Sequence, residues 1–117
     1  MDSHVIAVID DDPAVLDSLK FLLESAGYTV AAYSSASAFL DDRLARPACL
    51  IVDQHMPAMT GLDLVAHLRQ AAAPIPALLI TGAPSPAIAA RASQLDIEML
   101  EKPAGENDVL KFIDAHL

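Results

Sequence analysis

Four short apolar segments of this sequence each lead directly into a polar residue, and this repetition constrains the fold more than any other feature. The segments are Val5–Ile9, Cys49–Val52, Ala77–Ile80 and Ile97–Leu100. Their length and apolar character suit strands that helices cover on both faces. Because the carboxyl ends of parallel strands meet at one edge of a sheet, we expect the polar residues that follow them to converge there.

Helix-like segments alternate with the strand-like ones, which is typical of an α/β domain with a mainly parallel sheet. A further strand is predicted over Tyr28–Tyr33, and Ala71–Pro74 is expected to be a connector. The predicted helices cover residues 13–26, Ser34 or Ser35 to about Leu44, a segment after Gly61 with Leu62, Val65 and Leu68 facing inward, residues 84–94, and Asn107 to Leu117. Five β/α units are too few for an eight-fold barrel, and right-handed crossovers leave more than one winding open.

Capping residues indicate where several of these helices begin and end. Asp12–Pro13 suits the N-cap and first position of the first helix, and Gly27 suits its end. Ser85–Pro86 provides the same kind of start for the helix over 84–94, which otherwise has the weakest pattern. Asn107 is the predicted N-cap of the last helix.

The composition fits one domain over residues 1–117, with no linker, repeat or second domain. Hydrophobic residues make up 54% of the chain, which excludes disorder, and the net charge of −9 argues against nucleic-acid binding by this domain. No apolar run approaches the roughly 20 residues that a membrane-spanning helix needs. Met1–His4 lacks the basic and apolar regions of a signal peptide. We therefore expect a cytoplasmic protein without a membrane partner.

Acidic residues follow two of the predicted strands, with Asp10 and Asp11 after the first and Asp53 after the third. Mg²⁺ prefers oxygen ligands and keeps several waters, so one or two carboxylates suffice when a phosphate completes its shell. If the two strands are neighbours, these acids predict a divalent-cation site. The alternative is a helix cap beside solvated acids, which is the interpretation that Asp12 favours. Adjacent acids at the end of an apolar strand are nevertheless costly without a cation.

The other polar residues at the strand ends favour phosphoryl transfer. The carboxylate of Asp53 can attack phosphorus to give an acyl phosphate if nearby positive charges let the phosphoryl group approach. Lys102 on one side and a metal ion on the other would supply that charge, and Thr81 can donate a hydrogen bond to a phosphoryl oxygen. Neither residue is a specific signal alone, so the prediction depends on their joint placement.

Four ordered motifs resemble those of response-regulator receiver domains of the CheY-like type. The matching stretches are Ile9–Asp12, Val52–Gly61, Leu79–Gly82 and Glu101–Pro103, and the similarity covers essentially the whole chain. The resemblance implies a flavodoxin-like (βα)5 three-layer sandwich, in which a parallel five-stranded sheet has the strand order 2-1-3-4-5.

The resemblance also implies a role for each site residue. Asp53 corresponds to the phosphoacceptor, Thr81 and Lys102 to the two side chains that contact the phosphoryl group, and Lys102–Pro103 to a bond that is commonly cis. The cofactor would be Mg²⁺ or Mn²⁺. Its predicted ligands are the carboxylates of Asp10, Asp11 and Asp53 and the backbone carbonyl of His55.

The implied function is that of a phosphoacceptor in a two-component phosphorelay. A histidine kinase or histidine phosphotransfer protein would donate the phosphoryl group, and a downstream protein that the sequence does not identify would recognise the changed surface. Such a domain is a signalling phosphoacceptor rather than an enzyme, with intrinsic autophosphorylation and autodephosphorylation only. A homodimer formed on phosphorylation, through the helix over 84–94, the strand Ile97–Leu100 and the last helix, is a further expectation.

Two positions near these elements depart from the family pattern. Met99 stands where relatives carry an aromatic residue that swings inward on phosphorylation, and Ala104 stands where another aromatic often follows the Lys-Pro pair. We therefore expect switching to use the loop after Thr81 and the helix over 84–94, since methionine has no hydroxyl with which to exchange partners.

Two other functions compete with this interpretation. A small phosphotransferase of the haloacid-dehalogenase type would place its nucleophile at Asp10, but it would leave Asp53 without a role and needs paired acids after a later strand. A pseudo-receiver would bind proteins without being phosphorylated, and the presence of Asp53, Thr81 and Lys102 argues against it.

Overall fold

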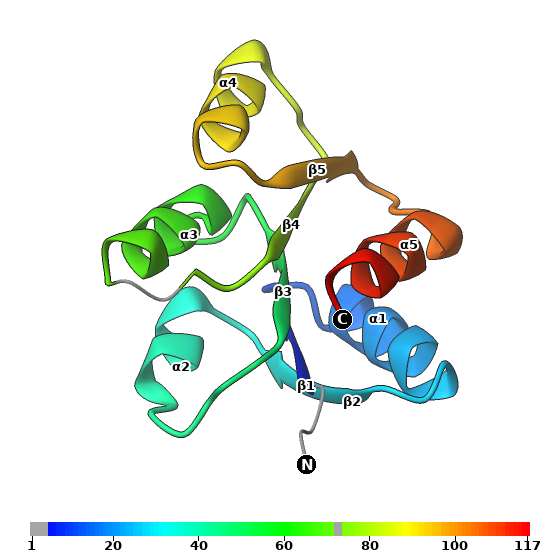
Figure 1. Ribbon diagram of the computed structural model, residues 1–117. Helices are drawn as coiled ribbons and strands as arrows, with labels where there is room; N and C mark the ends of the chain where they lie inside the picture. Colours follow the sequence, from blue (N-terminus) through cyan, green and yellow to red (C-terminus); the bar gives the residue numbers. More distant parts are fainter. Residues whose placement is uncertain (1–4, 72–73) are drawn as a thin grey trace.

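The computed structural model describes residues 5–71 and 74–117, in which five strands and five helices alternate along the chain (Figure 1). The strands are β1 (Val5–Ile9), β2 (Thr29–Tyr33), β3 (Cys49–Asp53), β4 (Ala77–Thr81) and β5 (Glu98–Glu101). They form one parallel sheet in the order β2-β1-β3-β4-β5, which confirms the predicted fold class and strand order. Residues 72–73 of the expected connector lie outside the described residues.

Helices cover both faces of this sheet (Figure 1). They are α1 (Pro13–Ser25), α2 (Ala36–Asp41), α3 (Gly61–Gln70), α4 (Pro86–Gln94) and α5 (Glu106–His116). The first and last lie on one face, and α2, α3 and α4 lie on the other. None of these helices is long and apolar enough to cross a membrane.

The core consists of two apolar layers that the alternation of each strand separates. Ile6 and Val8 point toward α1 and α5, whereas Ala7 and Ile9 point toward the other three helices. All residues of β3 and β4 are buried, including the free thiol of Cys49. The central strands are therefore fixed on both faces, and they hold the residues at their carboxyl ends in place.

Most predicted helix starts are confirmed, and one is wrong. Asp12, Ser35 and Ser85 are N-caps whose side chains accept a hydrogen bond from a backbone N–H in the first turn. Gly27 follows the end of α1 with a φ of 96°, a conformation that glycine adopts without strain. The N-cap of α5 is Gly105 rather than Asn107, and no side chain caps it.

Three predicted boundaries also differ. The second helix ends at Asp41, so Leu44 lies outside it and is 90% exposed. Leu117 is also exposed instead of completing an apolar helix face. The last strand is one residue later than predicted, because β5 pairs with β4 from Glu98 to Glu101. None of these three differences displaces a predicted site residue from its strand end.

Candidate functional site

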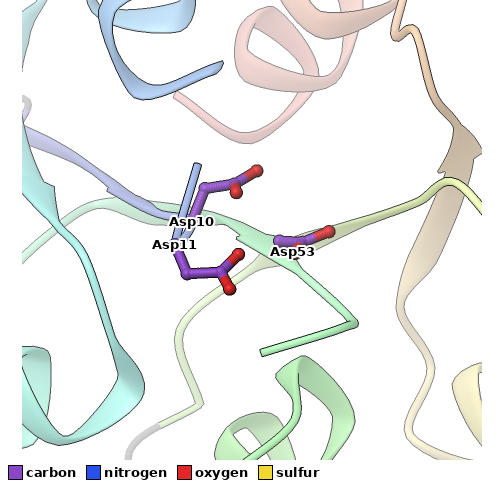
Figure 2. A group of neighbouring side chains, drawn as sticks. All are labelled: Asp10, Asp11 and Asp53. Carbon is purple, nitrogen blue, oxygen red and sulfur yellow. The ribbon is translucent and has the colours of Figure 1, made fainter. Parts of the chain in front are cut away.

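The three acids predicted to bind metal lie together at the carboxyl edge of the sheet (Figure 2). Asp10 and Asp11 follow β1, Asp53 ends β3, and β1 and β3 are hydrogen-bonded neighbours. One carboxylate oxygen from each residue lies within 4.8 Å of the others. Asp10 and Asp53 are 2% and 4% exposed, whereas Asp11 faces solvent. The cluster is thus open on one side only.

Backbone hydrogen bonds fix the position of Asp10. Its N–H donates to the carbonyl of Tyr33 on β2 at 3.1 Å, and its Oδ1 accepts from the N–H of Asp12 at 2.9 Å. The carboxylate of Asp12 caps α1 by accepting from the N–H of Ala14 at 3.0 Å. Asp12 therefore has a structural role, as predicted, whereas Asp10 and Asp11 belong to the acidic cluster.

Lys102 places its ammonium group between the two buried carboxylates. Its Nζ lies 3.0 Å from Oδ2 of Asp10 and 3.1 Å from Oδ1 of Asp53. The backbone N–H of Lys102 donates to the carbonyl of Thr81 at 2.9 Å, which anchors the loop after β5 to the end of β4. The Lys102–Pro103 peptide bond is cis, as the resemblance predicted.

The surroundings change the acidity of both partners. Burial raises the pKa of Asp53 above its ordinary value of 3.8, the hydrogen bond from Lys102 opposes this, and the neighbouring Asp10 adds to it. Partial burial alone would lower the pKa of Lys102, but the carboxylates of Asp10 and Asp53 outweigh it, so its pKa is raised. A buried acid whose charge is unfavourable gains from a cation nearby.

Thr81 ends β4 at the same carboxyl edge of the sheet where Asp53 ends β3. Thr81 is completely buried at the end of β4, one residue beyond Ile80, which pairs with Asp53 in the sheet register. Its Oγ1 accepts a hydrogen bond from the N–H of Ala83 at 3.1 Å, so the hydroxyl retains its proton for donation. It therefore tethers the loop before α4 while it keeps a hydrogen-bond donor at this edge of the sheet.

The donor set fits a divalent magnesium or manganese ion. Carboxylate oxygens from three residues at this spacing are the hard ligands that such ions prefer, and the open side leaves room for waters or a phosphate. An acidic cluster of this kind is typical of the Mg²⁺ site of receiver domains. The side chain of His55 is exposed in the loop after β3, and its backbone carbonyl as a ligand remains a prediction.

The two departures from the family pattern lie on opposite faces of the sheet. Met99 is half-buried and packs against the core layer beneath α2, α3 and α4. Ala104 lines a cavity of about 430 Å³ between α1 and the loop after β5, with Val15, Leu19 and Pro103 among its walls. The small side chain of Ala104 leaves this space beside Lys102 unfilled.

One buried polar residue near the site was not singled out from the sequence. Gln54 directly follows Asp53, is 7% exposed, and accepts a hydrogen bond through Oε1 from the N–H of Leu62 at 2.9 Å. The sequence contains no signal for this contact, because a glutamine in a loop is usually solvated.

A doubly wound α/β sheet with clustered acids and a lysine at its carboxyl edge defines a flavodoxin-like domain with a candidate phosphoryl site. Residues 6–114 match the response regulator receiver domain, and the chain therefore belongs to that family.

Individual relatives agree with this assignment. The chain is 37% identical to the transcriptional regulatory protein FixJ of Bradyrhizobium diazoefficiens over 115 residues, covering 94% of this chain and 55% of FixJ. It is 38% identical to the response regulator protein TodT of Pseudomonas putida over 117 residues, covering 98% of this chain and 52% of TodT. The crystal structure of FixJ-N superposes with a TM-score of 0.87 at 30% identity, covering 100% of this chain and 98% of that one. The chain thus spans about half the length of the curated relatives that it matches.

Proposed function

We propose that Asp53 is the phosphoacceptor of a two-component phosphorelay and that a divalent cation held by Asp10, Asp11 and Asp53 assists the transfer. Receiver domains are signalling modules that partner with histidine kinases, rather than classic enzymes. The observation that carries the proposal is the position of Lys102, whose ammonium touches the buried Asp53 carboxylate at 3.1 Å. The ammonium of Lys102 offsets negative charge beside Asp53, so a negatively charged phosphoryl group can approach the carboxylate.

Each site residue has a distinct role in the proposed transfer to Asp53. A carboxylate oxygen of Asp53 attacks phosphorus of a phosphohistidine, the P–N bond breaks, and its electron pair returns to the imidazole of the donor protein. Lys102 and Thr81 neutralise and hydrogen-bond the phosphoryl oxygens on the acyl phosphate that forms. A Mg²⁺ ion held by Asp10, Asp11 and Asp53 would supply further neutralisation of the negative charge of the phosphoryl group.

The changed surface is proposed to lie around α4, β5 and α5, where an added charge at Asp53 would be sensed through Thr81 and Lys102. A downstream protein, or a second phosphorylated copy, would bind to this surface. At the metal site, the backbone carbonyl of His55 would be a further ligand of the cation. We propose that residues 1–117 act as one receiver unit and that the protein works in the cytoplasm.

Phosphorylation of the Asp53→Asn variant tests the proposal most directly. Incubation with a small phosphodonor and Mg²⁺ should add one phosphoryl group to the wild type and none to the variant, because an amide is not a nucleophile for this reaction. Intact-mass measurement detects the change. Phosphoryl transfer to Asp10 instead would favour a phosphotransferase of the haloacid-dehalogenase type.

A titration with Mg²⁺ tests the metal assignment. Asp11→Ala should weaken binding by about tenfold or more, because it removes a carboxylate ligand and the charge repulsion that the cation relieves. Asp17→Ala, at an exposed acid on α1, is the matched control and should bind as the wild type does. Equal affinity of Asp11→Ala and wild type would exclude Asp11 as a ligand.

A further inference from the structure

Four polar side chains are buried among the residues that the structure describes, and three of them belong to the proposed site. Those three are Asp10, Asp53 and Thr81, and the fourth is Gln54. Burying a carboxamide costs free energy unless it is hydrogen-bonded, so its contacts indicate what it does. Gln54 lies next to the proposed phosphoacceptor and turns away from it toward the start of α3.

Gln54 satisfies the amino terminus of α3 from across a loop. The first N–H groups of a helix have no partner within the helix. In α3 the N–H of Gly61 donates to the backbone carbonyl of Gln54 at 3.2 Å, and that of Leu62 donates to its Oε1 at 2.9 Å. The next N–H, that of Asp63, is capped by Thr60 at 3.2 Å. One residue thus accepts the first two helical N–H groups.

These bonds close the loop 55–60, which would carry the predicted carbonyl ligand. The carbonyl of Gln54 also accepts from the N–H of Met56 at 3.2 Å, and its own N–H donates to Ile80 on β4 at 2.9 Å. Within the loop, Ala58 has a φ of 69°. An alanine keeps a left-handed backbone conformation only where the surrounding contacts hold it. The loop therefore has one defined conformation.

The helix held in this way lies directly on the phosphoacceptor backbone. A Cβ atom at Gly61 would lie 2.6 Å from the carbonyl oxygen of Asp53. A small shift of the α3 amino terminus would therefore displace the Asp53 backbone or the loop that begins beside it. Sub-ångström displacements of this kind matter for a metal ion that demands near-ideal geometry.

We propose that the side chain of Gln54 is a positioning group for the metal and phosphoryl site, acting through the Leu62 N–H that its carboxamide accepts; this rests on the proposed function. The carboxamide sets where the loop 55–60 and α3 lie relative to Asp53, without contacting the cation. Replacing a residue that orients metal ligands typically lowers metal affinity or activity by about 10- to 100-fold.

The test compares variants of Gln54 in the intact chain. Gln54→Leu has similar size but accepts no hydrogen bond, so it should weaken Mg²⁺ binding by about tenfold or more and expose the Leu62 amide to exchange. Gln54→Glu keeps an acceptor at the same position, so it should retain protection of that amide and bind Mg²⁺ at least as tightly as the wild type. Gln54→Met, which also lacks a strong acceptor, replaces the leucine variant if that protein does not fold.

Two control variants separate positioning from general stability. Gln70→Leu makes the same chemical change at the exposed end of α3 and should leave Mg²⁺ affinity unchanged. Val65→Ala removes buried volume from the same helix and should lower stability without weakening Mg²⁺ binding of the folded protein.

Two outcomes would overturn the inference. One is a folded Gln54→Leu protein that binds Mg²⁺ as tightly as the wild type, and the other is a Val65→Ala protein that loses as much affinity. Phosphorylation by a small donor is measured separately. If the wild type takes no phosphoryl group, the proposed function fails, while the Mg²⁺ and amide-exchange results still decide the role of Gln54.

Discussion

The helices α3 and α4 cover the same face of the sheet and each follows a strand that ends in a site residue, yet they are held very differently. Five residues of α3 are buried: Gly61, Leu62, Leu64, Val65 and Leu68. In α4 the single buried residue is Ala92. Figure 1 shows α3 against the centre of the sheet and α4 at its outer end, beyond β4 and β5.

This difference in packing indicates different roles for the two helices: α3 supports the proposed reactive residue, and α4 is the helix that can move. The loop into α3 supports Asp53 and is closed by Gln54, whereas the loop into α4 begins at Thr81 and Gly82 and is tethered by one side-chain bond to Ala83. Segments with few buried apolar contacts open at lower free energy than the core. We infer that a phosphoryl group at Asp53 would leave α3 in place and move α4.

Exchanging glycine for alanine at the first residue of α3 and in the loop before α4 should give the largest contrast. Gly61→Ala places a Cβ 2.6 Å from a backbone oxygen and 2.8 Å from Cδ1 of Leu79, so something must shift. We expect a loss of about 2–3 kcal/mol in the free energy of unfolding and slower phosphorylation. Gly82→Ala meets nothing closer than 4.0 Å and should change stability by less than about 0.5 kcal/mol. Urea unfolding followed by far-UV circular dichroism measures both, and equal losses would contradict the comparison.

Amide exchange should show a smaller but still clear difference between the two helices. In the unmodified protein the amides of α4 should exchange faster than those of α3, because α4 buries less apolar surface. Addition of Mg²⁺ and a phosphoryl mimic should change exchange most within residues 82–104. If the largest changes fell instead in α1 and α2 while residues 82–104 stayed silent, the response would lie elsewhere.

Removing the ion pair between the two helices should have the smallest effect. Nη1 of Arg91 lies 2.9 Å from Oδ1 of Asp63, and both side chains are more than two-fifths exposed. Arg91→Gln should therefore cost only about 0.5 kcal/mol in unfolding free energy. Lys20→Gln, which removes the 3.8 Å pair with Glu24 on α1, is the control and should cost less.

The same ion pair predicts a pH dependence with a definite sign. The hydrogen bond from Arg91 holds the pKa of Asp63 below its ordinary value of 3.8. An acid whose pKa is lower in the folded state stabilises the fold above its unfolded pKa and loses that contribution as the pH falls through the folded one. The difference between wild type and Arg91→Gln should thus be present at neutral pH, decrease once the pH falls below the ordinary pKa of Asp63, and vanish only below its lowered pKa in the folded protein. A difference that persisted there would have a cause other than this charge pair.

The parts of the molecule that the sequence predicted well depend on local chemistry. Strand identity followed from short apolar segments. Asp12 and Ser85 could be assigned as N-caps, and the cap of the second helix narrowed to Ser34 or Ser35, because their side chains act on adjacent residues. The acids could be expected to converge because parallel strands share a carboxyl edge. The order of the strands came from resemblance, since five β/α units alone allow several windings.

The features that escaped prediction depend on distant contacts. Gln54 is buried only because α3 folds back onto the end of β3, which no periodicity in the loop reveals. Asn107 is a residue type that favours the N-cap position, but α5 begins one residue earlier, at Glu106. Its N-cap is therefore Gly105. Lys102 was expected beside Asp53, but its simultaneous contact with Asp10 was not, because that contact requires β1, β3 and β5 to meet at one edge.

The position of Lys102 also gives the site a counter-ion that never leaves the molecule. Its ammonium group already touches both Asp10 and Asp53, so a dication that binds these carboxylates has to share them. Cation binding is then an exchange of partners, and its net free energy is smaller than the attraction between the dication and unpaired acids. We expect the occupancy to follow the free cation concentration instead of remaining full at trace levels. If Asp53 accepts a phosphoryl group as proposed, its phosphorylation should depend on the concentration of the cation as well as on that of the phosphodonor.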